Sequence, residues 1–146
     1  MRIVVACLMS SLVLLCTSCS DRNRQEPVYP VEGKVTYNGS PASGAAVFFR
    51  RKTDPLSMEP TIMGIVQENG RFEMESGALG KGAPAGDYDV LIEWKRVTGH
   101  GIRRPQTRPD LLQGHFSDPR HPLFHAKIVA APNKLPPFEL AAPSGG

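Results

Sequence analysis

Cysteine is nearly missing from this chain, and the few cysteines present stand at its beginning. The 146 residues include three, Cys7, Cys16 and Cys19. Everything after residue 19 is therefore without a disulfide, a cysteine-ligated metal or a cysteine nucleophile.

Long apolar runs and a strong charge of either sign are missing too. The apolar run at residues 3–15 is shorter than the about 20 residues that a membrane-spanning helix needs. A formal net charge of +3 gives no strong attraction to nucleic acid or to an acidic partner. No long amphipathic helical pattern is present, whereas 14 glycines and 14 prolines suit a loop-rich β-protein.

The start of the chain has a positive residue, an apolar stretch and then a cysteine. Arg2 precedes the run at residues 3–15, and Cys19 follows it closely. This order resembles a bacterial lipoprotein signal peptide. The resemblance implies that residues 1–18 are removed and that Cys19 receives acyl chains such as palmitate, which hold the protein on a membrane.

Two features near Cys19 leave alternatives open. Thr17 and Ser18 are the small residues expected before an acylated cysteine, but Cys16 stands where such signals usually carry leucine. Cys16 is itself a poorer acceptor because bulky Leu15 precedes it. An ordinary signal peptide cleaved near Ser18 and an uncleaved anchor are the other interpretations.

The chain divides into segments of different composition. Residues 19–30 are polar, mixed in charge and contain two prolines, which predicts a flexible tether between the lipid and the domain. Residues 31–140 contain the strand patterns and are expected to form one folded domain. We expect residues 141–146 to fray.

The domain opens with the pattern of a β-hairpin. Val31, Val35 and Tyr37 alternate with polar residues, and this period of two suits a half-buried strand. The Asn-Gly pair at 38–39 tolerates the positive φ that a tight reversal needs. The apolar run at 45–49 then suits a strand that is buried on both faces.

About seven short strands with frequent turns predict an all-β fold, an antiparallel seven-stranded β-sandwich. We expect the segment 97–122 to be a long loop containing one capped helical turn at 110–114, and we expect the strand at 135–140, with two prolines, to lie at an edge. The predicted strands are 31–37, 45–51, 61–67, 71–75, 86–94, 126–130 and 135–140. The predicted inward side chains are Val31, Val35, Val47, Phe49, Ile65, Phe72, Met74, Tyr88, Val90, Ile92, Trp94, Ile128 and Leu140.

Several motifs follow one another in a characteristic order. They are Gly-x-Val at 33–35, Gly-x-Pro at 39–41, Gly-Ala-x-Val at 44–47, Asn-Gly-x-Phe at 69–72 and Gly-x-Tyr-x-Val at 86–90. Their order resembles the carboxypeptidase regulatory-like, transthyretin-like domains. The segments 112–123 and 133–140 resemble the small planctomycetal lipoproteins built on that domain.

This resemblance implies a seven-stranded, prealbumin-like (Ig-like) sandwich outside the cytoplasm. Such domains are usually accessory, so no catalytic residue is carried over. The hydroxyisourate hydrolases are an enzymatic relative and end in Tyr-Arg-Gly-Ser, whereas this sequence ends in Ala-Pro-Ser-Gly-Gly.

Three histidines form the most chemical-looking cluster. His115, His121 and His125, with Asp118 between them, are residue types that suit zinc, nickel or copper. Their spacing matches no known metal signature, and nearby prolines impose an extended path. We therefore predict no metal site, with these histidines as the weak candidates, and we predict no cofactor.

Acidic residues and glycines suggest two further sites. Asp87, Asp89 and Glu93 share one strand face, which suits calcium or acid–base chemistry but more commonly forms a solvated face, here with Arg71 as a neighbour. The glycine-rich stretch 77–82 resembles a phosphate loop superficially, but lacks the first glycine and the final Ser or Thr. We predict a solvated face and a flexible connection.

Basic residues gather at 50–52, 95–96 and 103–104. No aromatic interleaving or recognition motif accompanies them, so we predict no nucleic-acid partner. Anionic lipid or an acidic glycopolymer is the better match for these charges.

The leading hypothesis is a non-catalytic binding or structural module, anchored by lipid on Cys19 in the cell envelope, with the loop 97–122 as its binding surface. One alternative is a metal-binding protein or metal-dependent enzyme that uses His115, His121 and His125. Another is an accessory subunit that docks on an envelope complex through an edge strand. The ligand, the oligomeric state and the membrane leaflet stay open.

Overall fold

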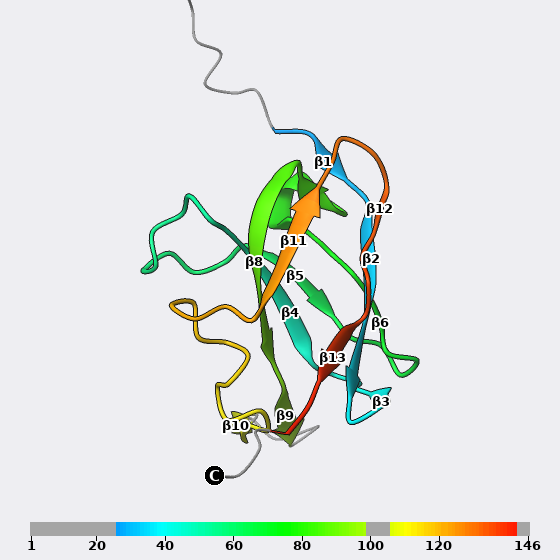
Figure 1. Ribbon diagram of the computed structural model, residues 1–146, viewed down its shortest axis with the longest axis vertical. Coiled ribbons are helices and arrows are strands. Elements are labelled where there is room, and N and C mark those ends of the chain that lie inside the picture. Colours follow the sequence, from blue (N-terminus) through cyan, green and yellow to red (C-terminus); the bar gives the residue numbers. More distant parts are fainter. Residues whose placement is uncertain (1–25, 99–105, 143–146) are drawn as a thin grey trace, which may run out of the picture.

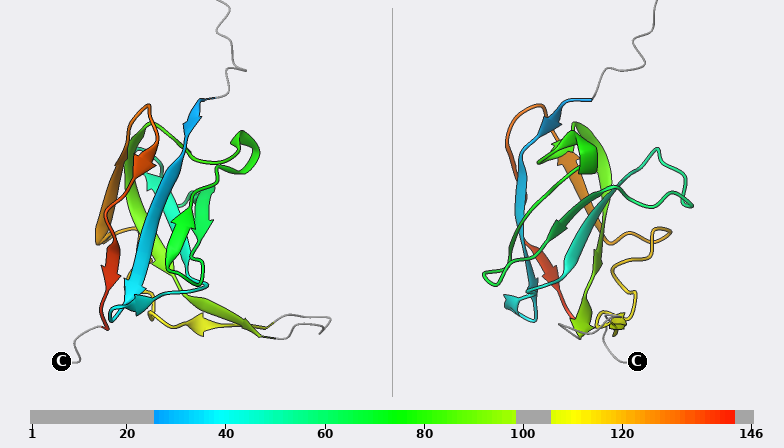
Figure 2. Two further views of the ribbon diagram at one scale, coloured as in Figure 1. Left: turned by 90° about the vertical axis from the view of Figure 1, so that its right-hand side faces the viewer. Right: turned by 180° about the vertical axis from the view of Figure 1, so that it is seen from behind.

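The structure, a computed structural model, describes residues 26–98 and 106–142, so the predicted signal peptide, Cys19 and most of the predicted tether lie outside it. The described residues form an all-β fold of two facing sheets, with one short 3-10 turn at Gly77–Leu79 (Figure 1, Figure 2). None of them belongs to a helix with the length and apolarity needed to cross a bilayer. The predicted β-sandwich is confirmed, although the described residues contain thirteen strand segments in place of seven.

One sheet, called here the β8 sheet, is antiparallel throughout and has the order β11-β8-β4-β5. Its two central strands place Val47 opposite Ile92 and Phe49 opposite Val90, and all four side chains are buried. These β-branched and aromatic residues suit strands that face a core. The strands are β4 at Ala46–Arg51, β5 at Ile62–Ile65, β8 at Gly86–Glu93 and β11 at Phe124–Ile128.

The facing sheet, called here the β2 sheet, is built around its first long strand. β2 pairs antiparallel with β3 and β6 on one side and parallel with β12 and β13 on the other. The closing segment therefore runs parallel to β2, and its prolines at 136–137 separate it into two short strands. The strands are β2 at Val31–Tyr37, β3 at Ser40–Pro41, β6 at Arg71–Glu73, β12 at Asn133–Lys134 and β13 at Phe138–Leu140.

Two small strand pairs were not predicted. Val28–Tyr29 (β1), placed by the sequence in the tether, pairs with Ala83–Pro84 (β7). Lys95–Thr98 (β9) pairs with Gln106–Asp110 (β10), so a strand pair occupies the first part of the predicted loop at 97–122. The predicted helical turn at 110–114 is also wrong. This stretch is a non-helical turn in which the Asp110 carboxylate accepts hydrogen bonds from the backbone amides of Leu112 and Gly114, and also from that of Trp94.

The predicted reversal at the first hairpin is confirmed. Asn38 and Gly39 have φ angles of 48° and 79°, the positive values that a type I′ turn requires. Asn38 tolerates this conformation through its short polar side chain, and Gly39 has no Cβ to clash.

The core lies between the two sheets. The rings of Phe124 and Phe138 meet across the sandwich with centroids 5.2 Å apart, and Phe72 stacks on Phe138 at 6.1 Å. Trp94, predicted to point inward, is half-buried, and its Nε1 donates to the carbonyl of Ser43 at 2.9 Å. Apart from Trp94 and Ile65, every predicted inward side chain is buried.

The prediction that Ile65 points inward is wrong. Ile65 is 52% exposed and Met63 is 39% exposed, whereas Ile62 is buried. The second inward position of β5, after Ile62, is Gly64, where a Cβ would lie 2.5 Å from the carbonyl oxygen of Glu73. Backbone from the neighbouring strand therefore passes where only glycine fits, and this contact sets which face of β5 is buried.

Candidate functional site

The three histidines of the predicted cluster are not all brought together. His115 and His121 line one open hollow of about 420 Å³ with Asp118. His125 lies on β11 and does not line that hollow. Across residues 26–98 and 106–142, no group of three His, Cys, Asp or Glu side chains is arranged to hold a metal ion.

The Asp118 carboxylate binds groups of the turn that follows it in the chain. Its Oδ1 accepts from the backbone N–H of Arg120 at 3.0 Å, and its Oδ2 lies 3.1 Å from Nδ1 of His121. These contacts, the Arg120 amide first and His121 second, lower the pKa of Asp118 to about 2. The carboxylate therefore stays ionised in any ordinary buffer and orders the loop beside it.

His125 has a different partner, a buried carboxylate. Its Nδ1 lies 3.0 Å from Oδ1 of Asp89, and 53% of its side chain is exposed. An imidazole held through one ring nitrogen keeps the other for a proton or a ligand.

The prediction that Asp89 lies on a solvated acidic face is wrong. The residue is 5% exposed, and its Oδ2 accepts from Nη2 of Arg50 at 2.7 Å. Arg71, expected as its neighbour, instead pairs with Glu32 on the other sheet at 2.6 Å. Arg50, Asp89 and His125 thus stand opposite one another across β4, β8 and β11.

Arg50 joins two loops to this row. Its Nη1 donates to the carbonyl of Asp54 at 3.0 Å, and its Nη2 donates to that of Pro119 at 3.3 Å. Its Nε is buried and has no hydrogen-bond partner, which costs about 1–3 kcal/mol. The guanidinium therefore holds the loops 52–61 and 111–123 against the sheet rather than facing solvent.

An apolar surface lies next to this polar row on the outside of the β8 sheet. The strand register places Phe48 between Met63 and Leu91 across three strands. Leu56 and Met58, from the loop after β4, border a hollow of about 410 Å³ with Phe48, Leu91, Ser117 and Pro119. We call this surface the apolar outer face; it consists of Phe48, Leu56, Met58, Met63, Ile65 and Leu91.

Four members of the apolar outer face are well exposed. The exposed fractions are 55% for Leu56, 51% for Met58, 39% for Met63 and 52% for Ile65. Its border contains the ion pair of Glu93 and Lys95, with Nζ and Oε2 2.6 Å apart. A contiguous apolar surface with a polar border is typical of an interaction site.

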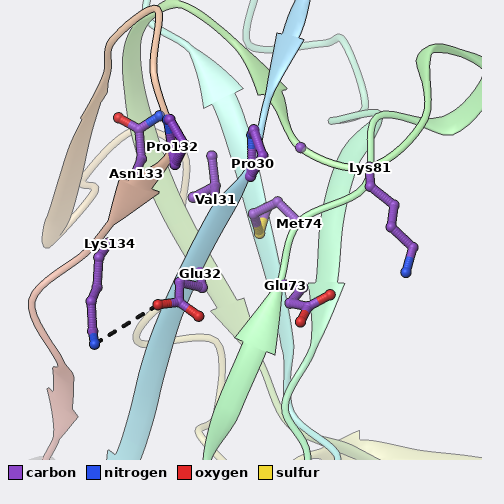
Figure 3. A pocket seen from close by; sticks show the side chains of 10 residues that line it. Pro30, Val31, Glu32, Glu73, Met74, Lys81, Pro132, Asn133 and Lys134 are labelled. Atoms are coloured by element: carbon purple, nitrogen blue, oxygen red, sulfur yellow. Dashed lines mark ion pairs between the residues drawn. The ribbon is translucent and has the colours of Figure 1, made fainter.

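The outside of the β2 sheet carries a hollow of a different kind. It measures about 330 Å³ and lies over β2, β12 and the end of β6. Figure 3 shows Glu32 and Lys134 facing one another on neighbouring strands, with Glu73 and Lys81 on the other side of β2. The Glu32 carboxylate lies 3.9 Å from Nζ of Lys134 and also binds Arg71.

The remaining predicted features occupy structural positions. The Ser76 hydroxyl, just before the glycine-rich stretch, donates to the carbonyl of Gly82 at 2.6 Å, and Gly82 packs against the backbone of Tyr29. Arg51 pairs with Glu26, and this hydrogen bond raises the pKa of Arg51. The basic pair at 103–104 lies outside the described residues, as Cys19 does.

Sequence reasoning missed the role of Arg50. It was grouped with Arg51 and Lys52 as a basic cluster, although Arg50 pairs with Asp89 and Arg51 pairs with Glu26. The sequence did contain a signal of this role. Arg50 and Asp89 carry opposite charges, and each lies in one of the two most apolar strands. Charges in such strands are rarely buried unless they are paired.

No protein-family model matches the chain, and no curated protein sequence matches it. Among solved structures, it is similar to a 9R-lipoxygenase from Cyanothece PCC8801, with 17% identity and a TM-score of 0.43 over 77% of this chain and 16% of that one. It is also similar to a DUF3823 family protein from Parabacteroides merdae ATCC 43184, with 13% identity and a TM-score of 0.40 over 79% of this chain and 46% of that one. The chain spans less than half of either structure, and at these scores neither likeness bears on function.

Proposed function

We propose that this protein is a non-catalytic binding or structural module held on the outside of a cell membrane by acyl chains on Cys19. The observation that carries the proposal is the order of parts along the chain. An apolar run at 3–15 leads to Cys19, and the first strand of the sandwich begins at Val28. A short spacer thus separates a candidate lipid anchor from a folded body.

The domain type belongs to the same proposal. We infer a carboxypeptidase regulatory-like, transthyretin-like domain from the order of its sequence motifs. Support comes from where the motif residues lie: Val35, Val47, Phe72, Tyr88 and Val90 are all fully buried between the sheets. Substitutions at these positions are expected to affect folding before they affect binding.

The binding surface of this module is the apolar outer face. Its exposed side chains are supplied by a rigid antiparallel sheet and by a loop that Arg50 ties to that sheet. Two residues of the predicted binding loop, Ser117 and Pro119, border the same hollow. Loops held on a rigid sandwich are common positions for recognition.

Labelling with an alkyne analogue of palmitate tests the anchor. We expect the label on the native chain and on Cys16→Ala, the matched control, and its loss from Cys19→Ala. The acylated forms should also move into the detergent phase on phase separation, because each buried methylene contributes about 0.8 kcal/mol. Label that persists on Cys19→Ala and disappears from Cys16→Ala would move the anchor to Cys16, and no label on any form would remove the proposal.

A further inference from the structure

We propose that the apolar outer face lies on the surface of the bilayer that anchors the chain, with Leu56 and Met58 entering the interfacial region. This inference rests on the proposed function and names the partner of that surface as lipid. The geometry that points to lipid is the place where the tether joins the sandwich.

The tether reaches the folded body beside the loop that carries these two side chains. Glu26, the first described residue, forms an ion pair with Arg51, the last residue of β4. The loop begins at the next residue, and Glu26 and Met58 line one hollow of about 310 Å³ together. Figure 1 shows the chain entering near β1, with the loop between β4 and β5 projecting from the side of the sandwich.

The spacer is too short to hold the bilayer far from this loop. Cys19 and Glu26 stand seven positions apart in the sequence. A fully extended chain spans at most about 3.3–3.6 Å per residue, so acylated Cys19 lies within about 25 Å of Glu26. The bilayer surface is therefore always within reach of the loop that begins beside Glu26.

The chemistry of the loop suits a lipid interface. Leu56 and Met58 are both more than half exposed, and Pro55 and Pro60 restrict the backbone around them. Apolar side chains beside a membrane anchor lower their free energy when they enter the boundary between head groups and acyl chains, because their apolar area is removed from water. After the loop, the exposed Met63 and Ile65 continue the apolar surface along β5.

Charge contributes little to this contact. The loop carries Lys52 against Asp54 and Glu59, so anionic head groups gain no net attraction from it. We therefore expect binding that persists on zwitterionic lipid and at high salt.

Lipid is favoured over a protein partner by proximity. A surface that a short tether holds beside a bilayer meets lipid at a high effective concentration, because the encounter is intramolecular. A protein partner has to be recruited to the same surface from solution or by diffusion in the membrane.

The test uses the acylated chain in phosphatidylcholine vesicles, with a polarity-sensitive fluorophore on one introduced cysteine. Labelling is specific because residues 20–146 contain no cysteine. The variants are Leu56→Cys and Met58→Cys, and the matched control is Ser40→Cys, an exposed position of β3 on the facing β2 sheet. Ser40 pairs with Tyr37, six positions along β2 from Val31, so the control lies on the other sheet and about 20 Å along it from the end that the tether joins.

We expect blue-shifted emission at positions 56 and 58, with quenching by nitroxide-labelled lipid several-fold stronger than at position 40, and no change in high salt. Adding Met58→Ser to the Leu56→Cys variant should weaken the quenching. Equal quenching at 56, 58 and 40 in protein that floats with the vesicles would overturn this inference and leave the anchor intact. Protein that does not float would overturn both, and protection found only in native envelope would assign the surface to a protein partner instead.

Discussion

The outer faces of the two sheets use similar residues in opposite ways. On the β8 sheet, Arg50 and Asp89 form an ion pair whose side chains are 7% and 8% exposed, beside an apolar surface. On the β2 sheet, Arg71 and Glu32 form a pair of nearly the same length, but their side chains are 56% and 37% exposed. The Arg50–Asp89 pair of the first face is thus covered, whereas the pair of the second face, called here the wet face, is open to water.

The difference shows that burial, not distance, decides what an ion pair does. The exposed pair exchanges freely with water and is worth little. The covered pair has lost its hydration, so each partner depends on the other, and Arg50 also holds two loops in place. Removing either Arg50 or Asp89 alone should therefore destabilise the sheet and the loops that support the apolar outer face.

The largest effect should come from removing one side of the covered pair. Asp89→Ala leaves the Arg50 guanidinium buried without its counter-ion, and we expect a loss of about 3–5 kcal/mol in the free energy of unfolding. Chemical denaturation measures it. Asp87→Ala, on the exposed part of the same strand, is the matched control and should change little. A loss no larger than that of the control would mean that the pair is hydrated after all.

The next effect separates the two faces of β5. Ile62→Ala removes a side chain that is 7% exposed and should cost about 2–5 kcal/mol. Ile65→Ala removes the same atoms from a side chain that is 52% exposed and should stay within about 0.5 kcal/mol. Thermal or urea unfolding of the two variants compares them directly, and the reverse order would show that β5 has the opposite face buried.

A smaller effect concerns the buried phenol on β8. The Tyr88 hydroxyl donates to the carbonyl of Pro84 at 2.8 Å, so Tyr88→Phe leaves that carbonyl unpaired and should cost about 1–2 kcal/mol. Burial raises the pKa of Tyr88, while the nearby Arg51 opposes the rise.

The raised pKa gives this variant a pH signature. The folded state favours the neutral phenol, so its contribution is complete below the ordinary tyrosine pKa of about 10 and is lost as pH rises through the raised value. The difference in stability between the native chain and Tyr88→Phe should therefore shrink in alkali. Unfolding followed at neutral and alkaline pH checks this, and a constant difference would contradict it.

The smallest effect is expected on the wet face. Glu32→Gln removes the charge that meets Arg71 and Lys134, and should cost about 0.2–1 kcal/mol at low salt. The cost should decrease further at high ionic strength because solvent ions screen exposed charges. A loss as large as that of Asp89→Ala would erase the distinction between the two faces.

Alternation along the strands predicted most of the fold. The side chains of Val35, Phe72, Tyr88 and Ile92 were placed inward from local pattern alone, and all are buried. Ile65 was misplaced because the apolar residues on β5 fit either face, and the choice depends on the backbone of β6 beside Gly64. No pattern within β5 contains that contact.

The candidate site was harder to predict than the fold. The sequence drew attention to His115, His121 and His125, but the fold places the third on another element, against Asp89. The apolar outer face combines residues from β4, β5, β8 and a loop, and no pattern within any one of these segments groups them. Their contiguity depends on strand order and register.

The sequence by itself determined that this chain forms β-strands and that all its cysteines precede the folded body, because alternation and residue identity are local properties. Tertiary structure alone decided that Arg50 and Asp89 are covered, that the closing segment runs parallel to β2, and that apolar side chains gather on one outer face. These outcomes depend on which strands become neighbours and on how much water remains between them, and both follow from packing across distant parts of the chain.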